Sequence, residues 1–236
     1  MTWSIVARDP VTGALGVAVT TKFFAVGALC PHAASGIGAL ATQALLNPTW
    51  GPRGLALLRE GVPAPDVVRL LVESDEGRET RQLHVVDAAG RVGRHTGSGC
   101  IGWAGHDDGP GFSVAGNMLA GPGVVEATAA TFAASAGHSL AERFLDALDA
   151  GQAEGGDKRG KQSAALVIYT AEDYPALSLR VDDHPEPLAE LRRLYGISQG
   201  RYAAFHQFMA TRANPSGTWD RSVIEAEALR REAATQ

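Results

Sequence analysis

The stretch TWSIVARDPVTGALGVAVTT, residues 2–21, decides the fold of this chain. Apolar and polar residues alternate over 2–8, the turn residues DPVTG follow at 9–13, and apolar residues return over 15–21. Alternation with a period of two is typical of a half-buried strand, and Pro and Gly favour the turn between two such strands. The chain is therefore expected to begin with a β-hairpin.

Thr2 comes directly after Met1, and this position gives it a possible chemical role. Removal of the initiator methionine would leave a free α-amine on Thr2, and a threonine with its own amine is a nucleophile with a built-in base. Ser4 is on the same strand face and could orient Thr2 or bind a substrate. The alternatives are that Met1 stays, that Thr2 is only a strand residue, and that the Ser4 hydroxyl is simply satisfied within the fold.

The rest of the chain alternates between blocks of strands and pairs of helices. Strands are predicted within 23–43 and at 81–87, 91–95, 112–118, 162–170 and 177–182, and helices at 51–60, 65–74, 122–136, 139–152 and 185–195, the last capped by Gly196. Strands that come in adjacent runs favour antiparallel sheets covered by helix pairs, an α+β fold, over a doubly wound parallel sheet. We expect one domain over residues 1–197 and a helical appendage over 198–236.

Composition narrows the classes of function. The 236 residues are 45% hydrophobic and 20% charged, as in an ordinary globular protein, and the net charge of −5 provides no basic surface for nucleic acid. No apolar run approaches the ~20 residues of a membrane span, and the sequence shows no signal-peptide pattern, so we expect no membrane partner and a cytoplasmic location. The two cysteines, Cys30 and Cys100, are expected to be reduced thiols.

Several motifs occur together and in order, and they resemble the domain-of-unknown-function 1028 family. They are TWSIVARDP at 2–10, GVAV at 16–19, GALATQ at 38–43, NPTWGPRGL at 47–55, GNMLAG at 116–121, GGDKRGKQSAAL at 155–166 and RVDDHP at 180–185. The resemblance covers roughly residues 2–195 and leaves the tail outside. That family is grouped with the N-terminal nucleophile hydrolases, so the resemblance implies a four-layer αββα sandwich. It implies no particular substrate.

Lys22 and Asn117 are candidate partners of Thr2. In proteasome-type relatives a lysine near the nucleophile lowers the proton affinity of the α-amine, and Lys22 is the only lysine before Lys158. Asn117 lies among small and apolar residues, where an amide N–H is suited to stabilising an oxyanion. The alternatives are a solvated charge at the end of a strand for Lys22 and a buried structural amide for Asn117.

The glycine-rich loop at 155–163 is the second candidate element. Its glycines permit close backbone approach, and Asp157, Arg159, Gln162 and Ser163 bring both charge signs and two further polar groups into a short span. Asp157 could hold the amine of Thr2, and the other three side chains could bind a substrate carboxylate. The alternative is an ordinary solvated loop. The order of residues does not match a phosphate-binding loop.

No metal and no cofactor are expected. The triplets at 106–108 and 182–184 contain histidine and aspartate, but adjacent strand residues point to opposite faces and seldom converge on one ion. The sequence thus predicts an enzyme that cleaves a small amide or peptide-like bond, assembled as a homodimer. A second hypothesis is a non-catalytic ligand-binding or interaction protein that retains the fold, and a third is a metal hydrolase that uses Asp182 and His184.

Overall fold

The N-terminal hairpin forms as the sequence predicts. In the computed structural model, which describes residues 2–234, β1 (Thr2–Arg8) pairs antiparallel with β2 (Leu15–Thr21). The Asp9 carboxylate accepts hydrogen bonds from the backbone N–H of Thr12 at 2.7 Å and from its hydroxyl at 2.9 Å. Gly13 supplies a left-handed φ of 73°, which a side chain would oppose. These contacts close the turn and fix the register of the two strands.

The strands form two sheets in which every pair is antiparallel. The first sheet has the order β10-β9-β2-β1-β8-β7, with β7 at Trp103–Gly109, β8 at Phe112–Leu119, β9 at Ser163–Tyr169 and β10 at Leu177–Val181. The second has the order β3-β4-β5-β6, with β3 at Pro31–Ala34, β4 at Gly38–Ala44, β5 at Arg81–Asp87 and β6 at Val92–Thr96. The prediction of an α+β fold with two antiparallel sheets is confirmed.

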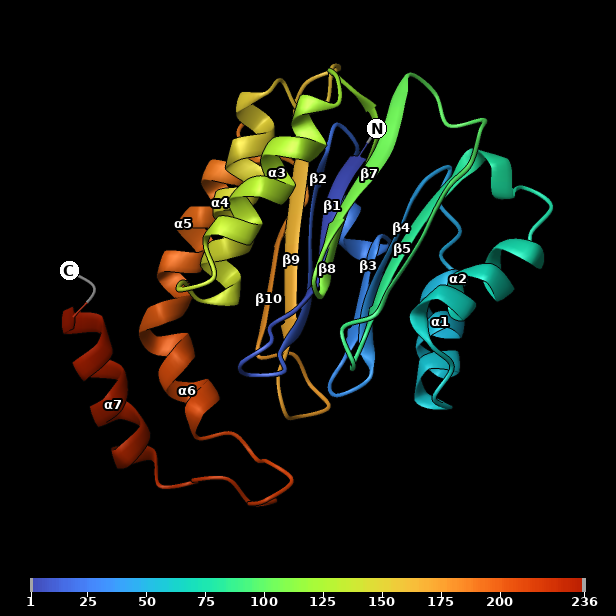
Figure 1. The fold of residues 1–236 in the computed structure, drawn as a ribbon. Helices are drawn as coiled ribbons and strands as arrows, with labels where there is room; N and C mark the ends of the chain where they lie inside the picture. The colour runs from blue at the N-terminus through green and yellow to red at the C-terminus, as the bar shows by residue number, and fades with distance from the viewer. Residues whose placement is uncertain (1, 235–236) are drawn as a thin grey trace. The chain divides into compact units, whose positions relative to one another are not determined.

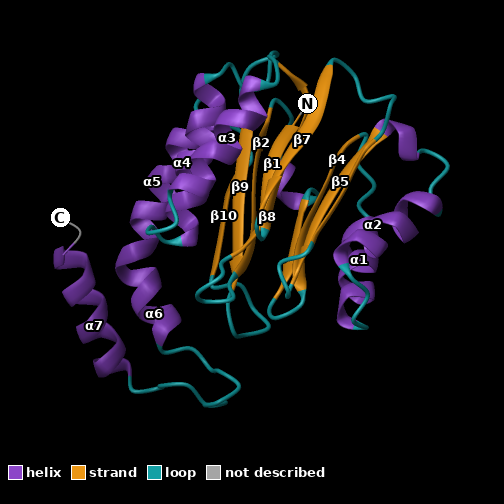
Figure 2. Ribbon diagram, in the orientation of Figure 1, coloured by secondary structure: helices purple, strands orange, loops and turns teal. Residues whose placement is uncertain are grey.

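Helix pairs cover the outer faces of the two sheets, which face each other (Figure 1). Helices α1 (Trp50–Arg59) and α2 (Ala64–Glu73) lie on the four-stranded sheet, and α3 (Gly123–Ala134) and α4 (Leu140–Ala153) on the six-stranded sheet (Figure 2). Helix α4 begins where the sequence predicts, because Ser139 and Glu142 form a reciprocal capping box.

Apolar side chains fill each space between layers. Small β-branched residues and alanines, among them Val6, Val17 and Ala41, pack between the two sheets. A second cluster that includes Trp50 and Leu71 joins α1 and α2 to their sheet. Because successive side chains of β1 point to opposite faces of the sheet, Thr2 and Ser4 lie on the same face as Val6 and point between the two sheets.

The chain divides into two compact units, Met1–Leu188 and Ala189–Gln236, and all the sheets belong to the first. The second unit contains most of α5 (Pro187–Ile197), a π-helical segment at Ser198–Tyr202, α6 (Ala203–Gln207) and α7 (Arg221–Ala234). Within it, the Arg201 guanidinium forms an ion pair with Glu225 of α7. The domain boundary predicted at 197 stays a prediction.

Two local predictions are wrong. β7 was not expected, because its sequence WAGHDDG has glycines and charges in place of alternating apolar residues; it is an edge strand that needs only one partner, β8. Gly196 does not cap α5, which continues to Ile197, and Gly196 is not among the glycines with a left-handed φ. No helix within residues 2–234 combines the length and apolar character needed to cross a bilayer.

Candidate functional site

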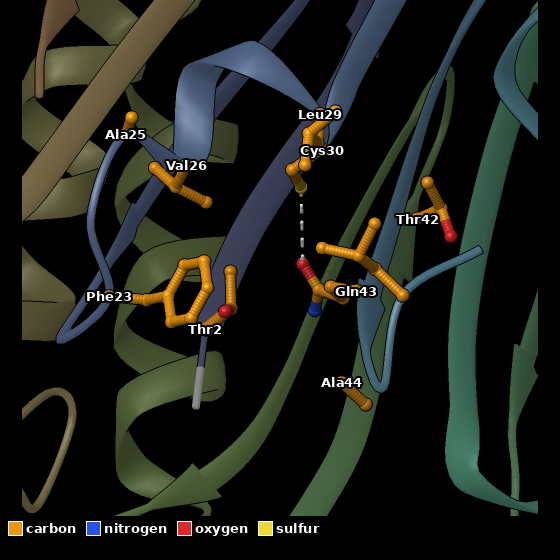
Figure 3. A pocket seen from close by; sticks show the side chains of 10 residues that line it. Thr2, Phe23, Ala25, Val26, Leu29, Cys30, Thr42, Gln43 and Ala44 are labelled. Atoms are coloured by element: carbon orange, nitrogen blue, oxygen red, sulfur yellow. Dashed lines mark hydrogen bonds between the residues drawn. The ribbon is translucent and has the colours of Figure 1, made fainter. Parts of the chain in front are cut away.

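A pocket opens beside Thr2, at the start of β1, where β2 and β4 end. Its volume is about 80 Å³, room for a small chemical group. Figure 3 shows side chains from three segments around it: Thr2, the connection after β2, and the end of β4. Those that matter here are Thr2, Phe23, Val26, Leu29, Cys30 and Gln43.

The Thr2 side chain is part of the pocket wall. Only 8% of the residue is exposed, and its hydroxyl donates a hydrogen bond to Thr21 Oγ1 at 3.1 Å. Thr21 is its register partner in β2, so the position of the hydroxyl is set by the pairing of the hairpin. The strand pairing therefore gives the Thr2 side chain a fixed place in the pocket wall.

Backbone strain gathers around this site. Among residues 2–234, three non-glycine residues have a left-handed φ: Ala25 at 52°, Ala44 at 67° and Met118 at 53°. Ala25 and Ala44 line the pocket, and Met118 follows Asn117, the partner of Thr2 in β8. Such conformations cost of order 1 kcal/mol and cluster at functional sites, because only the surrounding structure can maintain them.

The glycine-rich loop supports the pocket from outside. Asp157, predicted to hold the amine of Thr2, accepts a hydrogen bond from the backbone N–H of Lys22 at 2.7 Å and pairs with Arg159 at 3.1 Å. The buried Ser163 hydroxyl donates to Phe23 O at 2.5 Å and accepts from Val26 N at 3.2 Å. Asp157 and Ser163 therefore fix the connection after β2 that forms one wall of the pocket.

Four further predicted site residues do not line the pocket. The Lys22 ammonium, expected to act on the amine, donates to Lys161 O at 3.1 Å. Gln162 donates from Nε2 to Asp183 Oδ1 at 3.1 Å. The Ser4 side chain is fully buried, so it is enclosed rather than placed to receive a substrate. Neither Arg159 nor Gln162 is among the residues that line the pocket.

Behind Thr2, a chain of buried polar side chains crosses from one sheet to the other. The Asn117 amide donates to Thr2 O at 3.4 Å and to Gln82 Oε1 at 3.1 Å. Gln43 Nε2 donates to the same Gln82 oxygen at 2.7 Å, and Gln43 Oε1 accepts from Ser4 Oγ at 2.6 Å. The predicted oxyanion donor, Asn117, thus already uses both of its amide hydrogens within the protein.

His84 continues this polar chain. Its Nε2 lies 2.8 Å from Ser4 Oγ and its Nδ1 lies 3.2 Å from Ser113 Oγ. The one Ser4 proton goes to Gln43, so Nε2 carries the hydrogen of the neutral ring and donates to Ser4. Burial, reinforced by the nearby His106, lowers the pKa of His84 to about 3. The imidazole is therefore neutral at physiological pH.

Sequence reasoning missed Gln43, Gln82 and His84. A signal was present, because LATQA and RQLHVVD place large polar residues inside strands that are otherwise apolar. A buried polar side chain needs a partner, so such positions predict a polar network between sheets. Cys30 also lines the pocket, but burial raises the pKa of its thiol and opposes a thiolate nucleophile.

The described part of the chain offers no group of three or more His, Cys, Asp or Glu side chains placed to hold a metal ion. The site consists of hydroxyls, amides and apolar walls.

The fold and pocket define an α+β protein with a threonine-lined pocket at the start of its first strand. Residues 2–191 match the family of unknown function DUF1028, and the chain belongs to that family. It is 32% identical to protein SPO2555 from Silicibacter pomeroyi, a DUF1028 structure, with a TM-score of 0.86 over 93% of this chain and 99% of the other.

A weaker likeness links the chain to Anbu, the ancestral β-subunit, from Yersinia bercovieri. The identity is 12% and the TM-score 0.41, over 89% of this chain and 99% of that one. No curated protein matches the chain.

Proposed function

We propose that removal of Met1 makes Thr2 the N-terminal nucleophile of an amide hydrolase. The observation that carries the proposal is the position of the Thr2 hydroxyl, in a pocket wall and bonded to Thr21 at 3.1 Å. The same residue would then provide the α-amine that takes up the hydroxyl proton. Met1 itself lies outside the described residues.

The reaction has two halves. Thr2 Oγ1 attacks the carbonyl carbon of the amide, its proton passes to the α-amine, and the C–N bond breaks as the leaving amine takes that proton. The acyl group is then held on Thr2 as an ester. A water molecule gives a proton to the α-amine and attacks the ester; the carboxylic acid leaves, and Thr2 Oγ1 regains its proton.

The pocket limits the acyl group of the substrate. Phe23, Val26 and Leu29 form apolar walls, and none of the lining residues within 2–234 carries a charged side chain. A charged acyl group would lose its hydration there without gaining a partner. The substrate proposed is therefore a small amide with an uncharged, apolar acyl group, and not one with a carboxylate bound by Arg159.

Asn117 acts as a positioning residue in this scheme. Its amide holds the carbonyl of Thr2 at 3.4 Å, and Gln82 holds Asn117 in turn. Its predicted role as an oxyanion donor stays a prediction, as does the effect of Lys22 on the amine. Asp157 and Ser163 support the wall that faces Thr2.

The layers of the first unit support the same class. Two facing antiparallel sheets with helix pairs outside (Figure 2) agree with the αββα sandwich of the N-terminal nucleophile hydrolases, to which the sequence motifs pointed. A homodimer, a cytoplasmic location and the absence of a nucleic-acid partner stay predictions.

The proposal is tested by hydrolysis of a panel of neutral amides with apolar acyl groups. We expect turnover by the wild type, retained activity in Thr2→Ser, and loss in Thr2→Ala. Thr170→Ala, at an exposed position just after β9, is the matched control and should keep wild-type activity. Equal binding of the amides by wild type and Thr2→Ala without turnover would instead support the ligand-binding alternative.

A further inference from the structure

A second pocket adjoins the first, and Ala44 lines both. Its volume is about 270 Å³, and its principal walls are Ala44, Leu45, Cys100, Ile101, Asn117 and Met118. Asn117 is the register partner of Thr2 across the β1–β8 pair, whereas the first pocket is walled by residues that follow Thr21, its partner in β2. The two pockets thus lie towards opposite strand neighbours of Thr2.

The second pocket is also suited to an uncharged group. Among the described residues, those that line it carry no charged side chain, and Leu45 and Ile101 are 66% and 69% exposed. Large apolar side chains at the mouth of a pocket gain free energy when a ligand covers them.

Its backbone is fixed by the fold. Ala44 and Met118, both with a left-handed φ, form parts of the wall, and Leu45 N donates to Thr80 O at 3.1 Å. Ala44 pairs with Arg81 of β5, and Met118 lies between two residues that pair with β7, so the paired backbone holds both left-handed conformations.

We propose that the second pocket binds the amine-side group of the substrate, so that the enzyme cleaves N-substituted amides with an apolar group on each side of the scissile bond. This proposal rests on the proposed function. The acyl group stays bonded to Thr2 in the ester and so occupies the pocket that Thr2 lines. The leaving group occupies the neighbouring pocket, which Asn117 connects to Thr2.

Cys100 gives a readout of this pocket that does not need turnover. The half-buried thiol lines the second pocket, whereas Cys30 is fully buried and serves as an internal reference. Burial raises the pKa of Cys100, so alkylation by iodoacetamide is followed at mildly alkaline pH.

The experiment uses the full-length Thr2→Ala variant with two probes. N-hexylacetamide has an apolar amine side and a minimal acyl group; hexanamide has an apolar acyl side only. We expect N-hexylacetamide to slow alkylation of Cys100 severalfold and hexanamide to leave it unchanged. Ile101→Ser should weaken the protection roughly tenfold. Ile197→Ser, another exposed isoleucine and 59% exposed, should not.

Protection by hexanamide alone, or by neither probe, overturns the proposal. In the wild type, kcat/KM for N-alkyl hexanamides should rise with the length of the N-alkyl group, and this gain should vanish in Ile101→Ser. A flat series overturns the assignment of the leaving group. Protection is measured on Thr2→Ala, so it reports on ligand binding in the second pocket even if the wild type hydrolyses no amide. Failure of the proposed pocket is therefore distinguishable from failure of the proposed hydrolase function.

Discussion

His84 should make the fold sensitive to mild acid. The imidazole is buried between the sheets, and burial together with His106 lowers its pKa to about 3, against 6.5 when unperturbed. Between these two values the unfolded chain takes up a proton that the folded protein excludes. The free energy of unfolding is therefore fully retained above the unperturbed pKa and decreases as the pH falls below it.

The expected loss in the free energy of unfolding follows from the difference between the folded and unperturbed pKa values of His84. Each pH unit below the unperturbed pKa removes about 1.4 kcal/mol, so lowering the pH from about 7 to about 4.5 should remove about 2 to 3 kcal/mol through His84 alone. Carboxylates with lowered pKa values, such as Asp9 and Asp87, add their own losses in acid. A variant that differs only at His84 separates the two contributions.

The assay is urea unfolding of wild type and His84→Gln at several pH values. Gln retains a polar group beside Ser4 but cannot titrate, so the free energy of the variant should depend less on pH by the stated amount. Equal pH dependence in the two proteins would refute the reasoning and would mean that the His84 ring ionises normally in the fold. An NMR titration of the seven histidines checks the same claim, because one ring should stay neutral down to about pH 4.

Three further predictions concern stability and the pocket wall. Gln82→Ala leaves the Gln43 and Asn117 amides without their shared acceptor, and should lower the free energy of unfolding by about 3 kcal/mol in denaturant titrations. Arg143→Ala removes a buried guanidinium that pairs with Asp9 at 3.6 Å and lies 4.0 Å from the Phe132 ring, with an expected loss of about 3 kcal/mol by the same assay. Asp157→Asn weakens the bond to Lys22 N, so hydrogen exchange at that amide should accelerate while exchange at Val17, in the middle of β2, stays unchanged.

The sequence was sufficient for most of the fold because its signals are local. Alternation in 2–8 and 15–21, and leucines at helical spacing in 51–74, report which face is buried, and burial determines strand or helix. The edge strand Trp103–Gly109 lacked that signal, since one of its edges and much of its surface face away from the core.

The site was only partly predictable, because it depends on which strands become neighbours. Thr2 and Asn117 could be singled out from the residues beside them, and the structure places them opposite each other. Gln43 and Gln82 meet because β4 and β5 pair, and they reach Asn117 because the two sheets stack, a consequence of tertiary packing. Lys22 could also be singled out from its place in the sequence, and its backbone N–H does bond to Asp157 beside the pocket. Its ammonium group, however, bonds to Lys161 O and does not line the pocket.

The most direct test of the central claim is intact-mass spectrometry of the protein treated with an apolar β-lactone, whose strained ring acylates a nucleophilic hydroxyl. We expect a chain that begins at Thr2 and gains one acyl group, mapped by fragmentation to Thr2 and absent from Thr2→Ala. A chain that retains Met1, or an acyl group that maps to another residue and persists in Thr2→Ala, would contradict the central claim.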